Sequence, residues 1–311
     1  MKTNNKKIQV SIGIPAYNEE ANILDLLKCL KNQIERDAKI GEIVIFTDGG
    51  DDNTIGLIKG FKDKRIKLVE GKDRKGQQFR QNQILRMFKG DVVVILEADI
   101  LPVNNFTINN LVKPYKIYKP NSFDMVIGSP VVVKPVGFFE RILAFGYKMK
   151  FKIFAEWKGG NNVYTCGGHS MKALSKRFAR KLSWPNDVPE DAYTYLYLKN
   201  LDYKLYREPS ANAYMRNVTT IGDRLKQTRK FISGKKSLYK HFSKKNVDAE
   251  YGIPIQLIIK HVAIEFIKHP LMLLLYLLEV VCNRIATIRE TKFNALYIPY
   301  NSSKKLNFAK K

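Results

Sequence analysis

The sequence is poor in cysteine and in acidic residues, and both shortages restrict what the protein can be. Its three cysteines, Cys29, Cys166 and Cys282, are widely spaced and form no Cys-x-x-Cys pair. This argues against a disulfide framework or a zinc site and favours a reducing compartment. Only 29 aspartates and glutamates stand against 54 lysines and arginines, a formal net charge of +25. We therefore expect an anionic partner, which can be nucleic acid, an acidic membrane surface or a phosphorylated substrate.

The sequence also lacks an uninterrupted apolar run of the roughly 20 residues that a membrane-spanning helix needs. Its most apolar part, residues 253–282, is broken by charged residues, by Pro270 and by Glu279. We predict that residues 253–289 form membrane-associated helices, as a pair lying in or dipping into the membrane interface. A long buried core helix and a tilted single span are the alternatives. The preceding basic segment, residues 223–252, would face anionic headgroups, and residues 290–311 would form a basic tail.

From residue 8 to about residue 133, two patterns alternate along the chain. Short apolar runs typical of buried strands are separated by segments of helical period. In the first of these helical segments, one face carries Ile23, Leu26, Leu27, Leu30 and Ile34. The alternation predicts an α/β fold with a mainly parallel, doubly wound sheet, in which ligands bind beyond the carboxyl ends of the strands.

Polar residues follow several predicted strands, at the edge of the sheet where ligands would bind. The first strand ends in IPAYNEE, residues 14–20, a loop with free backbone N–H groups that leads into a helix at Asn18. After the second strand, Asp48 can accept a hydrogen bond from a base or a ribose. Lys75 and Gly76 lie in a further loop, with Arg80 one turn on. The two cations, Lys75 and Arg80, would face the acidic loops, as cations do in a pyrophosphate site that holds a metal. An ordinary polar surface is the alternative for each loop taken alone.

The stretch VVVILEADILP, residues 92–102, sets two acids one residue apart at the end of a buried strand. In an extended segment Glu97 and Asp99 point to the same side, so their charges repel each other. A divalent cation removes this conflict, because hard cations take oxygen ligands and can complete their shell with diphosphate oxygens. We therefore predict a metal and diphosphate site at Glu97 and Asp99, with Mg²⁺ or Mn²⁺ as the ion. An exposed turn is the alternative.

Two later segments carry further candidates. Glu190 and Asp191 open a helix directly after a proline, which suits the helix dipole and would equally suit a general base. Residues 224–231, RLKQTRKF, form a cationic and aromatic stretch that contains Gln227 and Lys230. A solvated basic helix face is its simpler explanation.

Taken together, the motifs resemble those of the family 2 glycosyltransferases, which have the GT-A fold. In chain order they are Pro-x-Tyr-Asn-Glu, an Asp-Gly loop, Lys-Gly, Glu-x-Asp, Gly-Gly, Glu-Asp and Gln-x-x-Lys-Phe, and they cover about residues 8–231. The resemblance is to cellulose-synthase-like and dolichyl-phosphate-sugar-synthase-like members. It implies a GT-A catalytic domain over residues 1–222, and the Glu-x-Asp and Gln-x-x-Lys-Phe motifs depart from the usual Asp-x-Asp and Gln-x-x-Arg-Trp.

The resemblance also implies roles for individual residues. Asp191 would be the catalytic base with Glu190 beside it, and Glu97 and Asp99 would hold the metal and the diphosphate. The residues expected to contact the nucleotide sugar are Pro15, Tyr17, Glu19, Asp48, Lys75, Gly76, Glu97, Gln227 and Lys230.

The expected reaction is an inverting single displacement from a GDP- or UDP-linked sugar. Because a lipid phosphate acceptor is already anionic and needs no base, the expected base favours a hydroxyl of a lipid-linked saccharide over polyprenyl-phosphate sugar synthesis. The expected location is the cytoplasmic face of the cell membrane, against anionic lipid. One rival is a nucleotidyltransferase, whose Gly-rich signature is missing near the first strand. The other is a nucleic-acid-binding protein, but the sequence has no zinc-finger, RNA-recognition or helix-turn-helix motif, so we expect no nucleic-acid partner.

Overall fold

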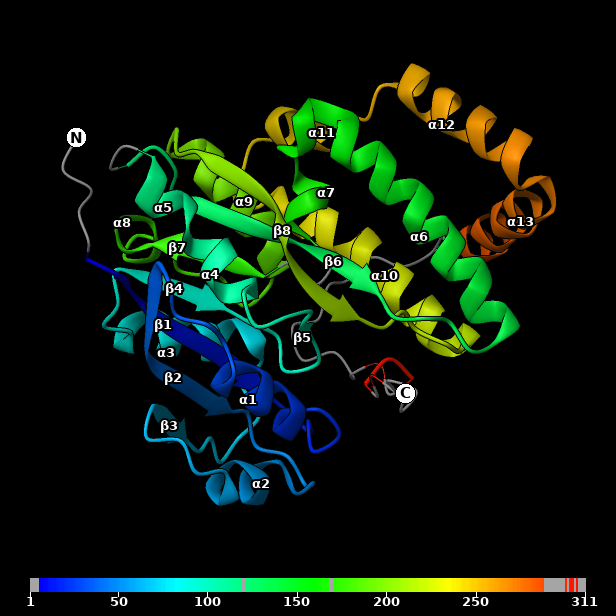
Figure 1. Cartoon of the computed structure of the whole chain (residues 1–311). Coiled ribbons are helices and arrows are strands. Elements are labelled where there is room, and N and C mark those ends of the chain that lie inside the picture. Colours follow the sequence, from blue (N-terminus) through cyan, green and yellow to red (C-terminus); the bar gives the residue numbers. More distant parts are fainter. Residues whose placement is uncertain are drawn as a thin grey trace.

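The computed structural model describes residues 6–118, 121–167 and 171–287, together with residues 300, 302–304 and 306. The second glycine of the predicted Gly-Gly motif and most of the predicted basic tail at 290–311 lie outside the described residues. Figure 1 shows a central twisted sheet with helices on both faces and two C-terminal helices at one end of the molecule.

The sheet has eight strands in the order β3-β2-β1-β4-β7-β6-β8-β5 within the described part of the chain. The strands are β1 (Ile8–Ala16), β2 (Ala38–Thr47), β3 (Ile66–Val69), β4 (Val92–Ile95), β5 (Leu101–Pro102), β6 (Met125–Val132), β7 (Lys172–Ser175) and β8 (Leu205–Met215). β3, β2, β1 and β4 pair in parallel, as the alternating pattern predicted. Beyond them β7 runs antiparallel to both β4 and β6, so the second half of the sheet is mixed.

Helices cover both faces of this sheet (Figure 1). They are α1 (Ile23–Lys31), α2 (Thr54–Gly60), α3 (Gln77–Met87), α4 (Thr107–Val112), α5 (Pro114–Ile117), α6 (Phe138–Glu156), α7 (Val163–Cys166), α8 (Lys176–Ala179), α9 (Glu190–Asn200), α10 (Ile221–Leu238), α11 (Lys244–Tyr251), α12 (Ile255–Lys268) and α13 (Pro270–Thr287), with a short 3-10 turn at Trp157–Gly160. The predicted apolar face of α1 is buried except for Ile34, whose placement on that face was wrong. Ile34 is 43% exposed because α1 ends three residues earlier, at Lys31.

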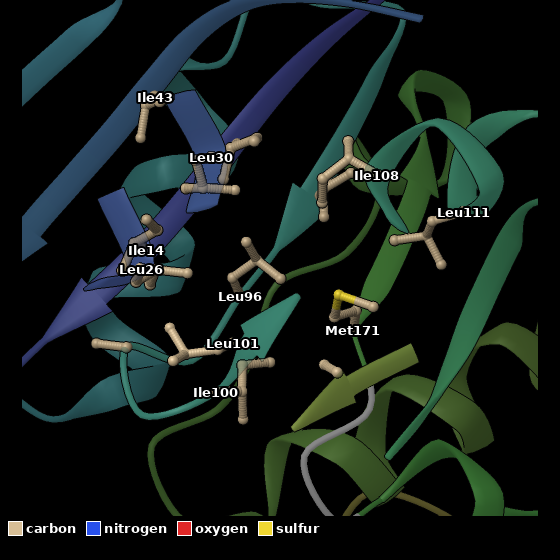
Figure 2. Packing of buried hydrophobic residues seen from close by; sticks show 14 of the residues in the cluster. Ile14, Leu26, Leu30, Ile43, Leu96, Ile100, Leu101, Ile108, Leu111 and Met171 are labelled. Carbon is tan, nitrogen blue, oxygen red and sulfur yellow. The ribbon is translucent and has the colours of Figure 1, made fainter. Parts of the chain in front are cut away.

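The sheet buries side chains on both faces because successive residues of a strand point in opposite directions. In β4, Val92 and Val94 belong to one core and Val93 and Ile95 to the other. Figure 2 shows the first core, where Leu96 lies beside the helices and strands of the parallel half. This continuous packing holds the carboxyl ends of β1, β2 and β4 at one edge of the sheet.

The apolar C-terminal region forms two helices, α12 and α13, with His269 between them. Both pack on α6, and α13 also packs on α10. Of the residues that the structure describes, only those of α13 make a helix long and apolar enough to cross a membrane, and 22% of its residues are buried. The alternative of a long buried core helix was therefore wrong. Exposed apolar side chains on the two helices are Ile255, Ile259, Phe266, Ile267, Leu271, Leu274, Leu277, Leu278, Val280, Val281 and Ile285.

Candidate active site

A pocket opens at the carboxyl ends of β1, β2 and β4, where the sequence predicted the ligand site. Nearly all of the predicted site residues line it: Pro15, Tyr17, Glu19, Asp48, Gly76, Glu97, Asp99, Glu190, Asp191, Gln227 and Lys230. Lys75 does not line the pocket, whereas its neighbour Arg74 does. The fold therefore brings together residues from widely separated parts of the sequence.

Asp48 organises the loop that follows β3. Its carboxylate accepts hydrogen bonds from the backbone N–H groups of Lys75 and Gly76, each at 2.8 Å, and from Nε of Arg80 at 2.7 Å. The side chain is almost fully buried, and both oxygens are engaged by the chain itself. Gly76, which directly precedes α3, has a φ of 96°, a conformation that favours glycine. Any contact of Asp48 with a base or ribose would therefore add to these bonds.

The loop after β1 is fastened to the loop after β2. The backbone N–H of Glu19 donates to Oγ1 of Thr54 at 2.7 Å, and the side-chain amide of Asn18 donates to Asp51 at 2.7 Å. Asn18 has a φ of 52°, so the helix does not begin there as predicted but at Ile23. A helix starting at Asn18 would place these donor groups elsewhere, so the hydrogen bonds between the two loops could not form.

Tyr17 presents an aromatic face to the pocket. The guanidinium of Arg74 lies 4.2 Å from the centre of the Tyr17 ring, a distance typical of a cation–π contact. Sequence reasoning chose Lys75 from the run Asp-Arg-Lys-Gly and missed Arg74. The two adjacent cations were the available signal, but only the loop geometry shows which one faces the pocket.

Glu97 and Asp99 follow β4 in a turn, because the strand ends at Ile95. The expectation of an extended segment there was wrong, yet both residues line the same pocket. The side-chain amide of Gln77, which sequence reasoning missed, lies 3.5 Å from Glu97 and 3.4 Å from Glu190. Glu97 and Glu190, which are far apart in the sequence, therefore share one amide at the centre of the pocket.

The acids of this pocket affect one another. Burial, and then the charge of Asp99, raises the pKa of Glu19 to about 8, while Lys304 opposes the change.

Within the described residues no three metal-ligating side chains gather at one point. A divalent cation at Glu97 and Asp99 would therefore take further ligands from diphosphate oxygens and water, which suits a hard ion that prefers oxygen.

The predicted acid pair lies at the first turn of α9. Asp191 forms an ion pair with Lys172 of β7, and both side chains are largely buried. Burial alone would lower the pKa of Lys172, but the charges of Asp191, Glu97 and Glu190 raise it. Burial and then Asp191 raise the pKa of Glu190 to about 7. Sequence reasoning missed Lys172, since one lysine in a short strand gave no signal.

A second cavity, of about 390 Å³, adjoins the same acid pair. Glu190, Asp191, Gln227, Lys230 and Phe231 line both this cavity and the pocket. Aromatic side chains from five helices, α6, α7, α10, α11 and α13, form much of its wall: Tyr147, Phe151, Phe154, Tyr164, Phe231, Tyr251 and Tyr276. Basic side chains complete it: Lys150, Arg224, Lys230 and Lys235.

Helix α13 is tied to this second cavity. Arg224 of α10 donates from Nε to Glu279 of α13 at 2.8 Å and from Nη1 to Gln227 at 3.2 Å. The acid that interrupts the apolar run is therefore paired inside the protein. On α6, burial and then Arg224 lower the pKa of Lys150 to about 8. The cavity thus combines an aromatic wall with basic side chains, which would interact favourably with a negatively charged group.

Residues 11–182 match the family model described as glycosyl transferase family 2. The chain is a family 2 glycosyltransferase. A curated relative from Methanococcus voltae, dolichyl N-acetyl-alpha-D-glucosaminyl phosphate 3-beta-D-2,3-diacetamido-2,3-dideoxy-beta-D-glucuronosyltransferase, is 33% identical over 35% of this chain and 35% of its own. Another, undecaprenyl-phosphate 4-deoxy-4-formamido-L-arabinose transferase of Shewanella sediminis, is 32% identical over 32% of this chain and 31% of its own. The matched part of this glycosyltransferase spans about a quarter to a third of the curated relatives it matches first.

Solved structures show the fold of this family 2 enzyme to be GT-A. A mannosyltransferase from Pyrobaculum calidifontis, in complex with GDP-mannose and Mn²⁺, superposes with a TM-score of 0.59 at 18% identity, over 92% of this chain and 84% of that chain. Glucosyl-3-phosphoglycerate synthase from Mycobacterium tuberculosis, in complex with Mg²⁺ and UDP, gives a TM-score of 0.52 at 14% identity, over 79% and 80%. The predicted fold class is confirmed.

Proposed function

We propose that this enzyme transfers a sugar from a nucleoside-diphosphate sugar to a hydroxyl group of a lipid-linked saccharide, with inversion at the anomeric carbon. One observation carries the proposal: Glu190 and Asp191 lie where the pocket at the strand ends meets the aromatic second cavity. A donor in the first space and an acceptor in the second would meet at these carboxylates. Such an arrangement suits a single displacement assisted by a general base.

The donor would occupy the pocket at the strand ends. Its base would lie near Tyr17 and Arg74, and its diphosphate near Glu97, Asp99 and Lys230. Glu97 and Asp99 would hold Mg²⁺ or Mn²⁺, which when bound neutralises charge on the diphosphate that departs. The solved neighbours that contain GDP-mannose with Mn²⁺ or UDP with Mg²⁺ support a divalent ion and a nucleotide donor here.

Asp191 would act as the base. Lys172 contacts its Oδ1 and so fixes the carboxylate, while Oδ2 can take the proton of the acceptor hydroxyl. As the hydroxyl oxygen bonds to the anomeric carbon, the bond from that carbon to the diphosphate breaks and its electron pair leaves with the diphosphate. Lys172 and Lys230 interact with the charge of Glu190 and would stabilise the charges that develop.

The acceptor would occupy the second cavity. Tyrosine and phenylalanine rings offer faces for sugar rings, and Lys150, Arg224 and Lys235 suit a phosphate. The M. voltae relative is named for a dolichyl-linked sugar phosphate, which supports a saccharide acceptor. The S. sediminis relative is named for undecaprenyl phosphate, which favours polyprenyl-phosphate sugar synthesis as the second candidate.

The lipid part of the acceptor requires a membrane nearby. In this proposal residues 1–222 form the catalytic domain, and residues 223–252 form a basic segment that also contributes Gln227 and Lys230 to the site. Helices α12 and α13, within residues 253–289, would rest on the cytoplasmic face of the cell membrane through their exposed apolar side chains. The net charge of +25 would favour anionic lipid.

The test replaces Asp191 by Asn and compares it with Asp187→Asn. Asp187 lies nearby but pairs with Lys240 and His241 at the surface. We expect Asp191→Asn to slow transfer to a hydroxyl acceptor by about 10²–10⁴-fold while nucleotide binding stays unchanged, and Asp187→Asn to transfer normally. The assay follows labelled sugar from nucleotide sugars into extracted membrane lipids.

The products of the same assay separate the two candidate functions. Near-normal transfer by Asp191→Asn to a hydroxyl acceptor would refute the base assignment. If the label instead joins lipid phosphate directly, the enzyme is a polyprenyl-phosphate sugar synthase.

A further inference from the structure

The chain returns to the donor pocket close to its C-terminus. Tyr300, Ser303 and Lys304 line the pocket together with the loops after β1 and β4. Figure 1 shows this segment in red. The sequence predicted only a basic tail here, and nothing in its composition pointed to the pocket.

Lys304 is the first anchor of this segment. Its ammonium donates hydrogen bonds to the backbone carbonyls of Tyr17, at 2.9 Å, and of Asn18. It also lies 3.3 Å from Oε1 of Glu19, and both side chains are largely buried. The three N–H donors of the ammonium therefore all have partners in the loop after β1.

Two further anchors hold the segment on either side of Lys304. The backbone N–H of Ser302 donates to Asp223 of α10 at 3.0 Å, and its hydroxyl accepts from the N–H of Thr219 at 3.1 Å. Leu306 is buried in the main hydrophobic core, and Asn22 donates from its amide to the carbonyl of Lys304. The segment thus connects α10 to the loop after β1, and both of these elements contribute residues to the donor pocket.

Lys304 also gives Glu19 a partner within the protein. Glu19 is buried, and the ammonium of Lys304 lies 3.3 Å from its Oε1. With Glu19 held by Lys304, a divalent ion would bind at Glu97 and Asp99. The same ammonium holds the carbonyl of Tyr17, whose ring faces the expected position of the base.

We propose that Tyr300, Ser303 and Lys304 form a wall of the donor site and that Lys304 is a positioning residue for nucleoside-diphosphate binding. Lys304 fixes the Tyr17–Glu19 loop against which the nucleoside lies, and it pairs with the carboxyl group of Glu19. It makes no contact with the reacting atoms. This inference rests on the proposed function, because it concerns the donor that the function requires.

The experiment measures the dissociation constants of GDP and UDP by titration calorimetry, with Mn²⁺ present, for the wild-type enzyme and three variants. Lys304→Met removes the charge, and Lys304→Arg keeps it. Lys116→Met is the matched control, because Lys116 also pairs with a largely buried acid, Asp37, but lies outside the pocket. Steady-state transfer gives the KM of donor and acceptor separately.

We expect Lys304→Met to raise the dissociation constant of the preferred nucleoside diphosphate and the KM of the donor by about tenfold or more. The KM of the acceptor and the kcat at saturating donor should stay within about threefold of wild type. Lys304→Arg should recover most of the affinity, and Lys116→Met should bind as wild type does.

Equal dissociation constants for the wild-type enzyme and Lys304→Met would overturn this role of Lys304. A purely structural role would lower the melting temperature or the active fraction without changing the affinity of the folded molecules, and this result too would overturn it. If the wild-type enzyme bound neither nucleotide, the proposed function itself would fail, and the role of Lys304 would fail with it.

Discussion

The buried carboxyl group of Glu190 makes the stability of this enzyme depend on pH in a way that one substitution can isolate. Burial, and then the charge of Asp191, raises the pKa of Glu190 from 4.5 to about 7. The folded protein therefore binds this proton more tightly than the unfolded chain does. By linkage, the raised pKa of Glu190 does not lower the free energy of unfolding below pH 4.5. This free energy falls as the pH rises from 4.5 through 7.

The size of this effect follows from the same pKa values. At about 1.4 kcal/mol per pH unit, raising the pKa from 4.5 to about 7 costs the folded state about 3 kcal/mol once the carboxyl group ionises. Glu190→Gln keeps the shape of the side chain but cannot ionise. The free energy of unfolding of the variant, relative to wild type, should therefore rise by about 3 kcal/mol between pH 4.5 and pH 8.

Urea unfolding at several pH values, with chelator present, measures this difference. A pH-independent effect of the substitution changes the free energy of unfolding by the same amount at every pH. The test therefore uses only the change with pH of the difference between the variant and wild type. Glu70→Gln serves as the control, because Glu70 is an exposed carboxylate paired with Lys59 at the surface. Parallel curves for wild type and Glu190→Gln would refute the argument that Glu190 is buried next to a like charge.

Two further predictions concern the C-terminal helices. A methyl group on Gly146 of α6 would lie 1.9 Å from the ring of Tyr276 on α13, so Gly146→Ala should destabilise the protein by about 1–3 kcal/mol. Gly137→Ala, where nothing lies within 4 Å, should cost much less, and equal melting temperatures for the two variants would contradict this packing. Vesicles containing anionic lipid should bind the enzyme in a salt-sensitive manner, and Leu274→Ser with Leu278→Ser should weaken that binding at least about fivefold, since both side chains are exposed. Sedimentation with vesicles measures it, and tighter binding to duplex DNA would favour the nucleic-acid alternative.

The parallel half of the sheet and the acidic loops were predictable because local patterns determine them. Apolar runs such as residues 92–95 form strands, and parallel strands that follow one another place their carboxyl ends at one edge. Glu97, Asp99 and Asp48 each follow such a strand, so their meeting at one pocket follows from topology. The local conformation of Glu97 and Asp99 does not follow from topology, since a turn replaces the expected extended segment after β4.

The remainder of the site depends on contacts between distant residues, for which local patterns give no signal. β7 is four residues long and lies between β4 and β6, and its Lys172 becomes the partner of Asp191 only through this pairing. Glu279 interrupts the apolar run, and the sequence around it does not indicate its partner, because that partner, Arg224, lies 55 residues earlier. Lys304 reaches a loop 285 or more residues away, which no periodicity in the tail could indicate.

The central claim is that Glu97 and Asp99 hold a divalent ion and, through it, the diphosphate of a nucleotide sugar. Its most direct test is a thermal-shift measurement with GDP and UDP, with Mg²⁺, with Mn²⁺ and with chelator, on the wild-type enzyme and on Asp99→Asn. The account predicts that one nucleotide stabilises the wild-type enzyme only when a metal is present, by about 3 kcal/mol at 100 times its dissociation constant, and that Asp99→Asn loses this effect. Equal stabilisation in chelator, or in Asp99→Asn, would contradict it.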